Sequence, residues 1–239
     1  MIEAPASKTT SDTGIGAVEP EEQLRADTYR LLGHLLGTPP DDATLALLAT
    51  APTSEDENLL AVAWRLLATT AARARADQVV TEYEALFIGL GRGELVPYAS
   101  WYLTGYLMEK PLAKLRSDLL TLGFERQEDV VEPEDHAAAL CETMALLAED
   151  NDLESLRTQA EFFATHIGPW MAQFFRDLQE STSARFYRAV GQLGEQFIET
   201  DQRYLDMVER PEACRPTSAN RDIPERRPGA GNRTHDGRQ

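Results

Sequence analysis

Apolar residues recur every three or four positions along most of the chain from residue 19 to residue 209, which is the pattern of amphipathic helices. The first such stretch follows an acidic cluster that begins at Glu19, and a glycine and two prolines end it. Ser54 and Glu57 have the spacing of a capping box, so we expect a long helix to begin there, after a short one over residues 42–50.

The second half of the chain continues this pattern. An apolar stretch with Tyr83, Leu86 and Phe87 stops at a glycine-rich loop over residues 89–93. Later helices are expected over residues 111–122, 133–149, 152–166, 171–178 and 183–208. No run alternates apolar and polar residues convincingly enough to predict a strand. The sequence therefore predicts an all-α fold, with about nine or ten helices in a single domain over residues 19–209.

The two ends of the chain differ from this domain in composition. Residues 1–18 are rich in small and polar residues, and residues 210–239 are rich in proline and arginine, so both predict disordered arms. The polar N-terminus lacks the apolar stretch of a secretory signal, and no apolar run is long enough to span a membrane. The pair Arg226-Arg227 lies too far from the N-terminus to be an export signal of this protein.

The formal net charge is −17, and it is unevenly distributed. From Arg210 onward seven arginines face four acidic residues, a balance of +3, so the rest of the chain carries −20. Such a body repels nucleic acid and anionic membranes, so we expect no nucleic-acid partner and no stable membrane association. Cys141 and Cys214 are the two cysteines, which fits a reducing compartment such as the cytoplasm.

The most distinctive segment contains Glu132, Pro133, Asp135 and His136, followed by Glu142. Proline and acidic residues are favoured in the first turn of a helix, so the segment predicts a helix that begins near Pro133. On that helix Asp135 and Glu142 would share one face. These residues raise three alternatives, which are a capped helix with a core histidine, a metal site and an acid/base pair. The six-residue separation of His136 and Glu142 disfavours a metal site, and no nucleophile or cofactor loop accompanies the acids.

This segment, read as Glu-x-x-Asp-His with Glu142 six residues later, resembles the signature of the TorD/DmsD/NarJ family, which are chaperones of molybdenum-cofactor oxidoreductases. Three further segments are similar to family patterns and occur in the same order. They are Tyr83-Glu84-Ala85-Leu86-Phe87, Pro97-Tyr98-Ala99-Ser100-Trp101-Tyr102 and His166-Ile167-Gly168-Pro169-Trp170. Together the four segments extend the resemblance over most of the chain, from about residue 24 to residue 208.

The resemblance implies a cytoplasmic chaperone, not an enzyme, with no metal or cofactor of its own. Its partners would be the apo form of a molybdoenzyme catalytic subunit and the twin-arginine leader of that enzyme, and its role would be to assist cofactor insertion and delay export. The implied binding residues are Glu132, Asp135, His136, Glu142, Leu86, Phe87, Pro97, Tyr98, Ser100 and Trp101. Tyr83, Pro133, His166 and Trp170 are implied as structural positions of the motifs.

The chemistry of a twin-arginine leader suits the implied binding residues, because the arginines of a leader can bind carboxylates and its apolar part can pack on aromatic side chains. Other functions stay open. One is a NarJ-type chaperone whose client has only a remnant leader. Another is a helical enzyme that uses Asp135, His136 and Glu142, and a third is a helical adaptor whose acidic surface only keeps it soluble. The identity of the client and the choice between monomer and homodimer stay open as well.

Overall fold

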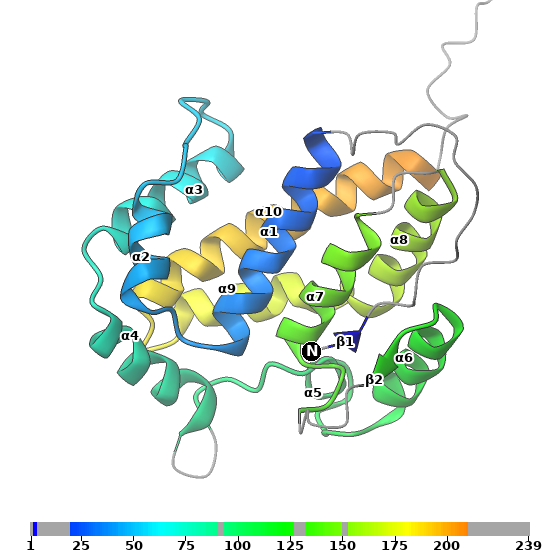
Figure 1. The fold of residues 1–239 in the computed structure, drawn as a ribbon. Helices are drawn as coiled ribbons and strands as arrows, with labels where there is room; N and C mark the ends of the chain where they lie inside the picture. The colour runs from blue at the N-terminus through cyan, green and yellow to red at the C-terminus, as the bar shows by residue number, and fades with distance from the viewer. Residues whose placement is uncertain (1, 4–19, 90–92, 127–131, 150–152, 210–239) are drawn as a thin grey trace, which may run out of the picture.

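The computed structural model describes residues 2–3, 20–89, 93–126, 132–149 and 153–209 (Figure 1). Within these residues it contains ten α-helices, which confirms the predicted all-α fold class. The helices are α1 (Pro20–Gly37), α2 (Asp42–Ala49), α3 (Leu59–Ala71), α4 (Ala76–Tyr83), α5 (Ala99–Thr104), α6 (Lys110–Thr121), α7 (Ala137–Leu147), α8 (Leu153–His166), α9 (Met171–Glu180) and α10 (Phe186–Glu209). None of the described helices has the length and apolar character that a membrane span requires.

Three short elements complete the described part of the chain. A π-helical turn, η1 (Glu84–Ile88), continues α4 directly. The two-residue strands β1 (Ile2–Glu3) and β2 (Glu125–Arg126) pair in antiparallel fashion. The first strand belongs to the arm for which we predicted disorder, and the rest of that arm and the tail from residue 210 lie outside the described residues.

The core forms where α1 packs along α7 and where α10 packs on α3, α8 and α9. Figure 1 shows α1 and α7 side by side, with α10 running behind α1. The first pair approaches closely because Gly33 has no side chain. A Cβ atom at this position would lie 3.2 Å from the carbonyl oxygen of Ala138 and 3.2 Å from Cγ of Glu142. This contact positions Glu142, which lies at the candidate site.

The predicted capping box at Ser54 and Glu57 is wrong. α3 begins at Leu59, and its cap is Asn58, whose side-chain oxygen accepts a hydrogen bond from the amide of Ala61 at 2.8 Å. The Ser54 hydroxyl oxygen instead accepts from a nearby backbone amide in the preceding loop. Asparagine caps helices as well as serine does, so the sequence contained two competing starts.

The predicted start of the distinctive helix is also wrong. α7 begins at Ala137, because His136 is its cap residue and accepts a hydrogen bond at Nδ1 from the amide of Ala138 at 3.1 Å. The residues from Pro133 to Asp135 form a turn before the helix. Asp135 is therefore not on a helical face, and it cannot share one with Glu142.

Candidate functional site

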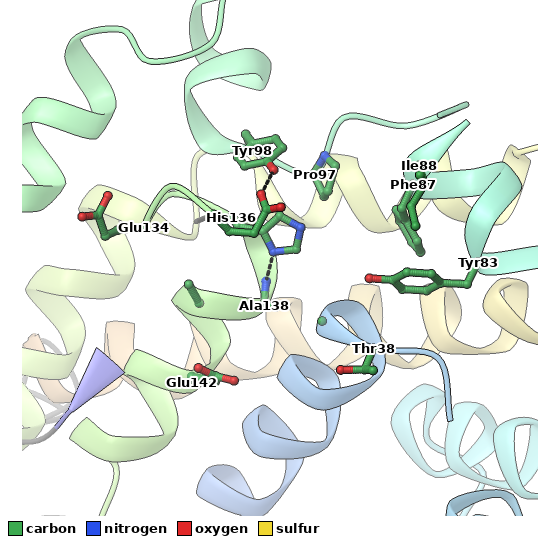
Figure 2. Close-up of a pocket in the computed structure, with 13 residues that line it drawn as sticks. Thr38, Tyr83, Phe87, Ile88, Pro97, Tyr98, Glu134, His136, Ala138 and Glu142 are labelled. Carbon is green, nitrogen blue, oxygen red and sulfur yellow. Dashed lines mark hydrogen bonds between the residues drawn. The ribbon is translucent and has the colours of Figure 1, made fainter. Parts of the chain in front are cut away.

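A cavity of about 360 Å³ opens between the C-terminal end of α1, the end of α4 with η1, the segment before α5, and the start of α7 (Figure 2). It brings together seven residues that the sequence singled out, from three of the four motif segments. These are Tyr83, Phe87, Pro97, Tyr98, Glu132, His136 and Glu142. Segments that are far apart in the sequence thus form the walls of a single cavity.

The segment before α5 is joined to the start of α7 by backbone pairing. The amide of Ala99 donates to the carbonyl oxygen of Asp135 at 2.9 Å, and the amide of Ala137 donates to that of Pro97 at 2.8 Å. Tyr98 and His136 lie opposite each other in this short antiparallel bridge, and their rings meet edge to face with centroids 5.0 Å apart. The pairing fixes both side chains on one wall of the cavity.

Asp135 supports this wall from behind and does not line the cavity. Its side chain is 1 % exposed, and one carboxylate oxygen accepts a hydrogen bond from the amide of Ser100 at 2.9 Å. The carboxylate therefore satisfies an amide in the first turn of α5, where backbone N–H groups otherwise lack partners. Asp135 has the geometry of a positioning residue for the segment that carries Tyr98.

Three other predicted binding residues also lie outside the cavity lining. Leu86 is fully buried in the hydrophobic core, because η1 turns this side chain inward. Ser100 is buried, and its hydroxyl has no hydrogen-bond partner in the described part of the chain. Trp101 follows on α5 and is half-buried.

Carboxylates dominate the charge of the cavity. Glu132, Glu134 and Glu142 line it, and the lining contains no arginine or lysine. Glu134 forms an ion pair with Arg116, whose Nη2 lies 2.9 Å away, and Figure 2 shows this carboxylate pointing away from the others. The Tyr98 hydroxyl donates a hydrogen bond to Glu132, and burial together with this carboxylate raises the pKa of the phenol. The cavity is therefore suited to a cationic group.

His136 is neutral at physiological pH. Burial lowers the pKa of its imidazole to about 4, although Glu132 and Asp135 act in the opposite direction. Because Nδ1 accepts the hydrogen bond from Ala138, the neutral ring carries its proton on Nε2. In this form His136 offers a hydrogen-bond donor without positive charge, so it does not repel a cation held by the neighbouring carboxylates.

The opposite wall is aromatic and depends on η1. The rings of Tyr83 and Phe87 lie 5.0 Å apart, and Phe87 also contacts Tyr187 edge to face at 5.4 Å. The Tyr83 hydroxyl donates to the carbonyl oxygen of Leu36 at 3.2 Å, which ties this wall to the end of α1. Figure 2 shows Tyr83 facing His136 across the cavity. π-Helical turns often occur at functional sites, and this one presents Phe87 to the cavity.

His166 and Trp170 lie at a different place, in the break between α8 and α9. His166 Nε2 lies 2.8 Å from an Asp118 carboxylate oxygen, and the Trp170 indole donates to the carbonyl oxygen of His166 at 2.8 Å. Burial lowers the pKa of His166 even though Asp118 would raise it. Trp170 is buried against Tyr102, with ring centroids 5.3 Å apart. This geometry is that of a packed helix junction.

Several lining residues were absent from the sequence prediction. Gly37, Thr38, Ile88, Glu134, Ala138 and Ala139 also line the cavity. The sequence did indicate that α1 contributes to the cavity, because Gly33 and Gly37 are four residues apart and lie on one helical face. The described residues contain no group of three His, Cys, Asp or Glu side chains placed to hold a metal ion.

Comparison with known proteins places this geometry in a family. The model of the nitrate reductase delta subunit family matches residues 54–176. The chaperone protein TorD of Shewanella loihica is 28 % identical over 203 residues, which cover 76 % of this chain and 93 % of the relative. TorD of Vibrio cholerae is 29 % identical over 138 residues, which cover 54 % of this chain and 63 % of the relative.

Among solved structures, a protein from Archaeoglobus fulgidus assigned to redox enzyme maturation is similar with a TM-score of 0.47 and 18 % identity. The alignment covers 81 % of this chain and 99 % of that one. The family match spans more than half of the chain and contains all four motif segments entirely. The chain belongs to the nitrate reductase delta subunit family, and its relatives include chaperone proteins named TorD.

Proposed function

We propose that this chain is a cytoplasmic chaperone that binds the twin-arginine leader and the apo form of a molybdenum-cofactor oxidoreductase, assists cofactor insertion and delays export until folding is complete. The observation that carries the proposal is the composition of the cavity. Three carboxylates and no arginine or lysine line it, beside an aromatic wall. A leader combines arginines with an apolar stretch, and the cavity offers both matching surfaces.

The cavity volume of about 360 Å³ suits one or two side chains and not a whole helix. In our proposal an arginine of the leader enters between Glu142 and Glu132, where charge-assisted hydrogen bonds hold its guanidinium. The planar group can also stack on Tyr83 or Tyr98, because cations are attracted to the faces of aromatic rings. Neutral His136 donates its Nε2–H to a backbone carbonyl of the leader.

The apolar part of the leader then packs on the rim next to η1. Ile88 lines the cavity and is 60 % exposed, although large aliphatic side chains are usually buried. Phe87 continues this surface inward. A leader held by a few contacts of this kind binds reversibly, which a chaperone requires if the enzyme is to be released for export.

A titration with a leader peptide tests the proposal. The full chain is titrated with a fluorescent peptide that carries two adjacent arginines before an apolar stretch. We expect Glu142→Gln to weaken binding at least tenfold, because the side chain keeps its shape and loses its charge. Glu57→Gln is the matched control, since Glu57 is exposed and lies outside the cavity lining. Equal affinity of the Glu142→Gln variant and the wild type would exclude leader binding in this cavity.

The NarJ-type alternative predicts a different response to the peptide. A chaperone whose client has a remnant leader does not need both arginines, so a peptide with two lysines would bind as well as the arginine peptide. We expect the lysine peptide to bind more weakly, because lysine cannot form the bidentate contact with a carboxylate.

A further inference from the structure

A second, larger cavity of about 850 Å³ lies between α3, α4 and the connection from α9 to α10. In Figure 1 these elements lie together at the left of the molecule, and α7 lies further to the right. The lining of this cavity shares no residue with that of the leader cavity. We refer to it as the arginine groove, after Arg73, Arg75 and Arg185 in its lining.

Two of these arginines have no partner within the described residues. The Arg75 guanidinium pairs with Asp77 at 3.1 Å, but neither Arg73 nor Arg185 has an ion pair or a side-chain hydrogen bond in that part of the chain. The other acid of the groove is also engaged. The Glu82 carboxylate accepts hydrogen bonds from three backbone amides at the start of α10, with distances between 2.7 and 3.1 Å. These neutral amides leave the Glu82 carboxylate charged, so the lining has three arginines against Asp77 and Glu82, a net charge of +1. The Arg73 and Arg185 side chains are exposed and form no ion pair within the described residues.

An apolar stripe on α3 leads into the arginine groove. Leu59, Val62 and Leu66 follow the i, i+3, i+7 spacing of one helical face, and they are 65, 36 and 38 % exposed. Leu66 lines the groove itself, and Arg73, which lies just beyond the end of α3 at Ala71, lines it as well. An apolar helical face that ends next to positive charges can bind the apolar side of an amphipathic helix.

We propose that the arginine groove and the α3 stripe dock an acidic amphipathic helix on the folded body of the client oxidoreductase. Charge complementarity determines this choice. The chain before Arg210 carries a net charge of −20, whereas the lining of the groove carries +1, so the groove favours an acidic ligand over a basic one. A basic leader would be repelled by the arginines of the groove, so the leader is not its ligand. The inference rests on the proposed function, because it assigns to the client a second contact outside its leader.

The test uses the full chain and a synthetic amphipathic peptide of roughly 18 residues, long enough to become helical when bound. The probe has leucines at i, i+3 and i+7 and three glutamates in its last turn, and the control peptide has lysines in their place. Fluorescence anisotropy should show binding of the glutamate peptide alone. The double variant Arg73→Glu, Arg185→Glu should weaken that binding at least tenfold.

Arg157→Glu is the matched control variant. Arg157 is exposed on α8, lies outside the groove lining and forms no ion pair or side-chain hydrogen bond among the described residues. The same change of charge at this position should leave the affinity for the glutamate peptide within twofold. Equal binding of both peptides, or equal loss in the two charge-reversed proteins, would overturn the inference.

Leader binding on the same proteins separates this inference from the proposed function. The Arg73→Glu, Arg185→Glu protein should bind the arginine leader as the wild type does. If the wild type binds the leader but not the glutamate peptide, the inference fails and the function stands. If it binds the glutamate peptide but not the leader, the leader proposal fails and the ligand class of the groove stands. Sedimentation showing that the wild type self-associates and the double variant does not would identify a second copy as the occupant.

Discussion

His136 has two roles that follow from one hydrogen bond. By accepting from the Ala138 amide it begins α7, and by the same bond it fixes the proton of its neutral ring on Nε2. A protonated ring would lose this acceptor and would place a positive charge in a cavity suited to a cation. Protonation of one side chain therefore affects both helix start and ligand binding.

The first prediction is that His136 makes the fold acid-sensitive. Its pKa is about 4 in the folded protein and about 6.5 otherwise, so between these values the unfolded chain binds more protons and acid favours unfolding. The contribution lost between pH 7 and pH 5 is about 2 kcal/mol at most. His136→Asn keeps a good capping side chain and does not titrate. Urea unfolding at both pH values should show a smaller loss for the variant. An identical loss would show that another group titrates.

The second prediction concerns Asp135, which the sequence assigned to the leader surface. Asp135→Asn keeps an oxygen that can accept from the Ser100 amide, and it leaves the cavity lining unchanged. We expect the variant to bind the leader peptide within about threefold of wild type, well short of the tenfold loss expected for Glu142→Gln. A loss as large as that of Glu142→Gln would show that the Asp135 charge itself binds the arginine. Circular dichroism confirms that both variants are folded.

At the scale of elements, η1 depends on Gly93. A Cβ atom at residue 93 would lie 2.4 Å from the carbonyl oxygen of Leu86 and 2.7 Å from the carbonyl carbon of Phe87, which are backbone atoms that cannot move aside cheaply. The backbone at Gly93 packs against the backbone of η1, and this contact holds the π-helical turn whose Phe87 side chain lines the cavity. The glycine is required for close approach of two backbone segments.

The third prediction is that Gly93→Ala destabilises the protein by about 1–3 kcal/mol, the range typical of overpacking, and weakens leader binding. Gly37→Ala is the matched control for stability, because a Cβ there would meet only the Ala138 methyl group at an ordinary 3.6 Å; Gly37 lines the cavity, so this variant is not a control for binding. Urea unfolding and the leader titration measure the two effects of Gly93→Ala. If the two alanine variants lose the same free energy of unfolding, the close approach at Gly93 does not determine the position of η1.

The helices were predictable from the sequence because each buries one face, and that requirement leaves a periodic pattern in the chain. The start of α7 was not, because it depends on a long-range contact. Asp135 caps α5 and pairs with the segment at Pro97, and neither partner is visible in the local sequence. The family resemblance grouped the segments that form the cavity, but helical geometry assigned Asp135 to the wrong face. Glu142 lies within α7, whereas Asp135 precedes the start of that helix, so the two side chains do not share a helical face.

At the scale of the whole molecule, a buried charge network joins α1 to α8 and α10. Arg25 donates to Asp201 at 2.5 Å, to Glu22 at 2.5 Å and to Gln159 at 2.9 Å, and the Tyr29 hydroxyl donates to Asp201 at 2.6 Å. These groups are nearly inaccessible to water. Charges buried in this way are costly to separate, so the network links three helices into one unfolding unit.

The fourth prediction is that Asp201→Ala lowers the free energy of unfolding by about 3–5 kcal/mol, because Arg25 and Tyr29 lose a buried acceptor. Asp77→Ala removes the exposed partner of Arg75 and should leave the free energy of unfolding close to that of the wild type, because exposed ion pairs contribute little. Urea unfolding of both variants compares them directly. Similar losses would show that Asp201 contributes no more than a surface pair.

The fifth prediction follows from the uneven distribution of charge. A body with a net charge of −20 attracts a basic leader from a distance and repels an acidic helix, while the contacts at each cavity act locally. Salt shortens the range of charge interactions from about 10 Å at 0.1 M to about 3 Å at 1 M. Raising salt should therefore weaken leader binding strongly.

The acidic helix should respond less to salt, because screening removes long-range repulsion and local attraction together. Anisotropy titrations of both peptides over this range of salt measure the difference. A leader affinity that does not change with salt would contradict electrostatic capture. It would favour an adaptor whose acidic residues serve only solubility, since a ligand held by apolar contacts alone does not weaken as its charges are screened.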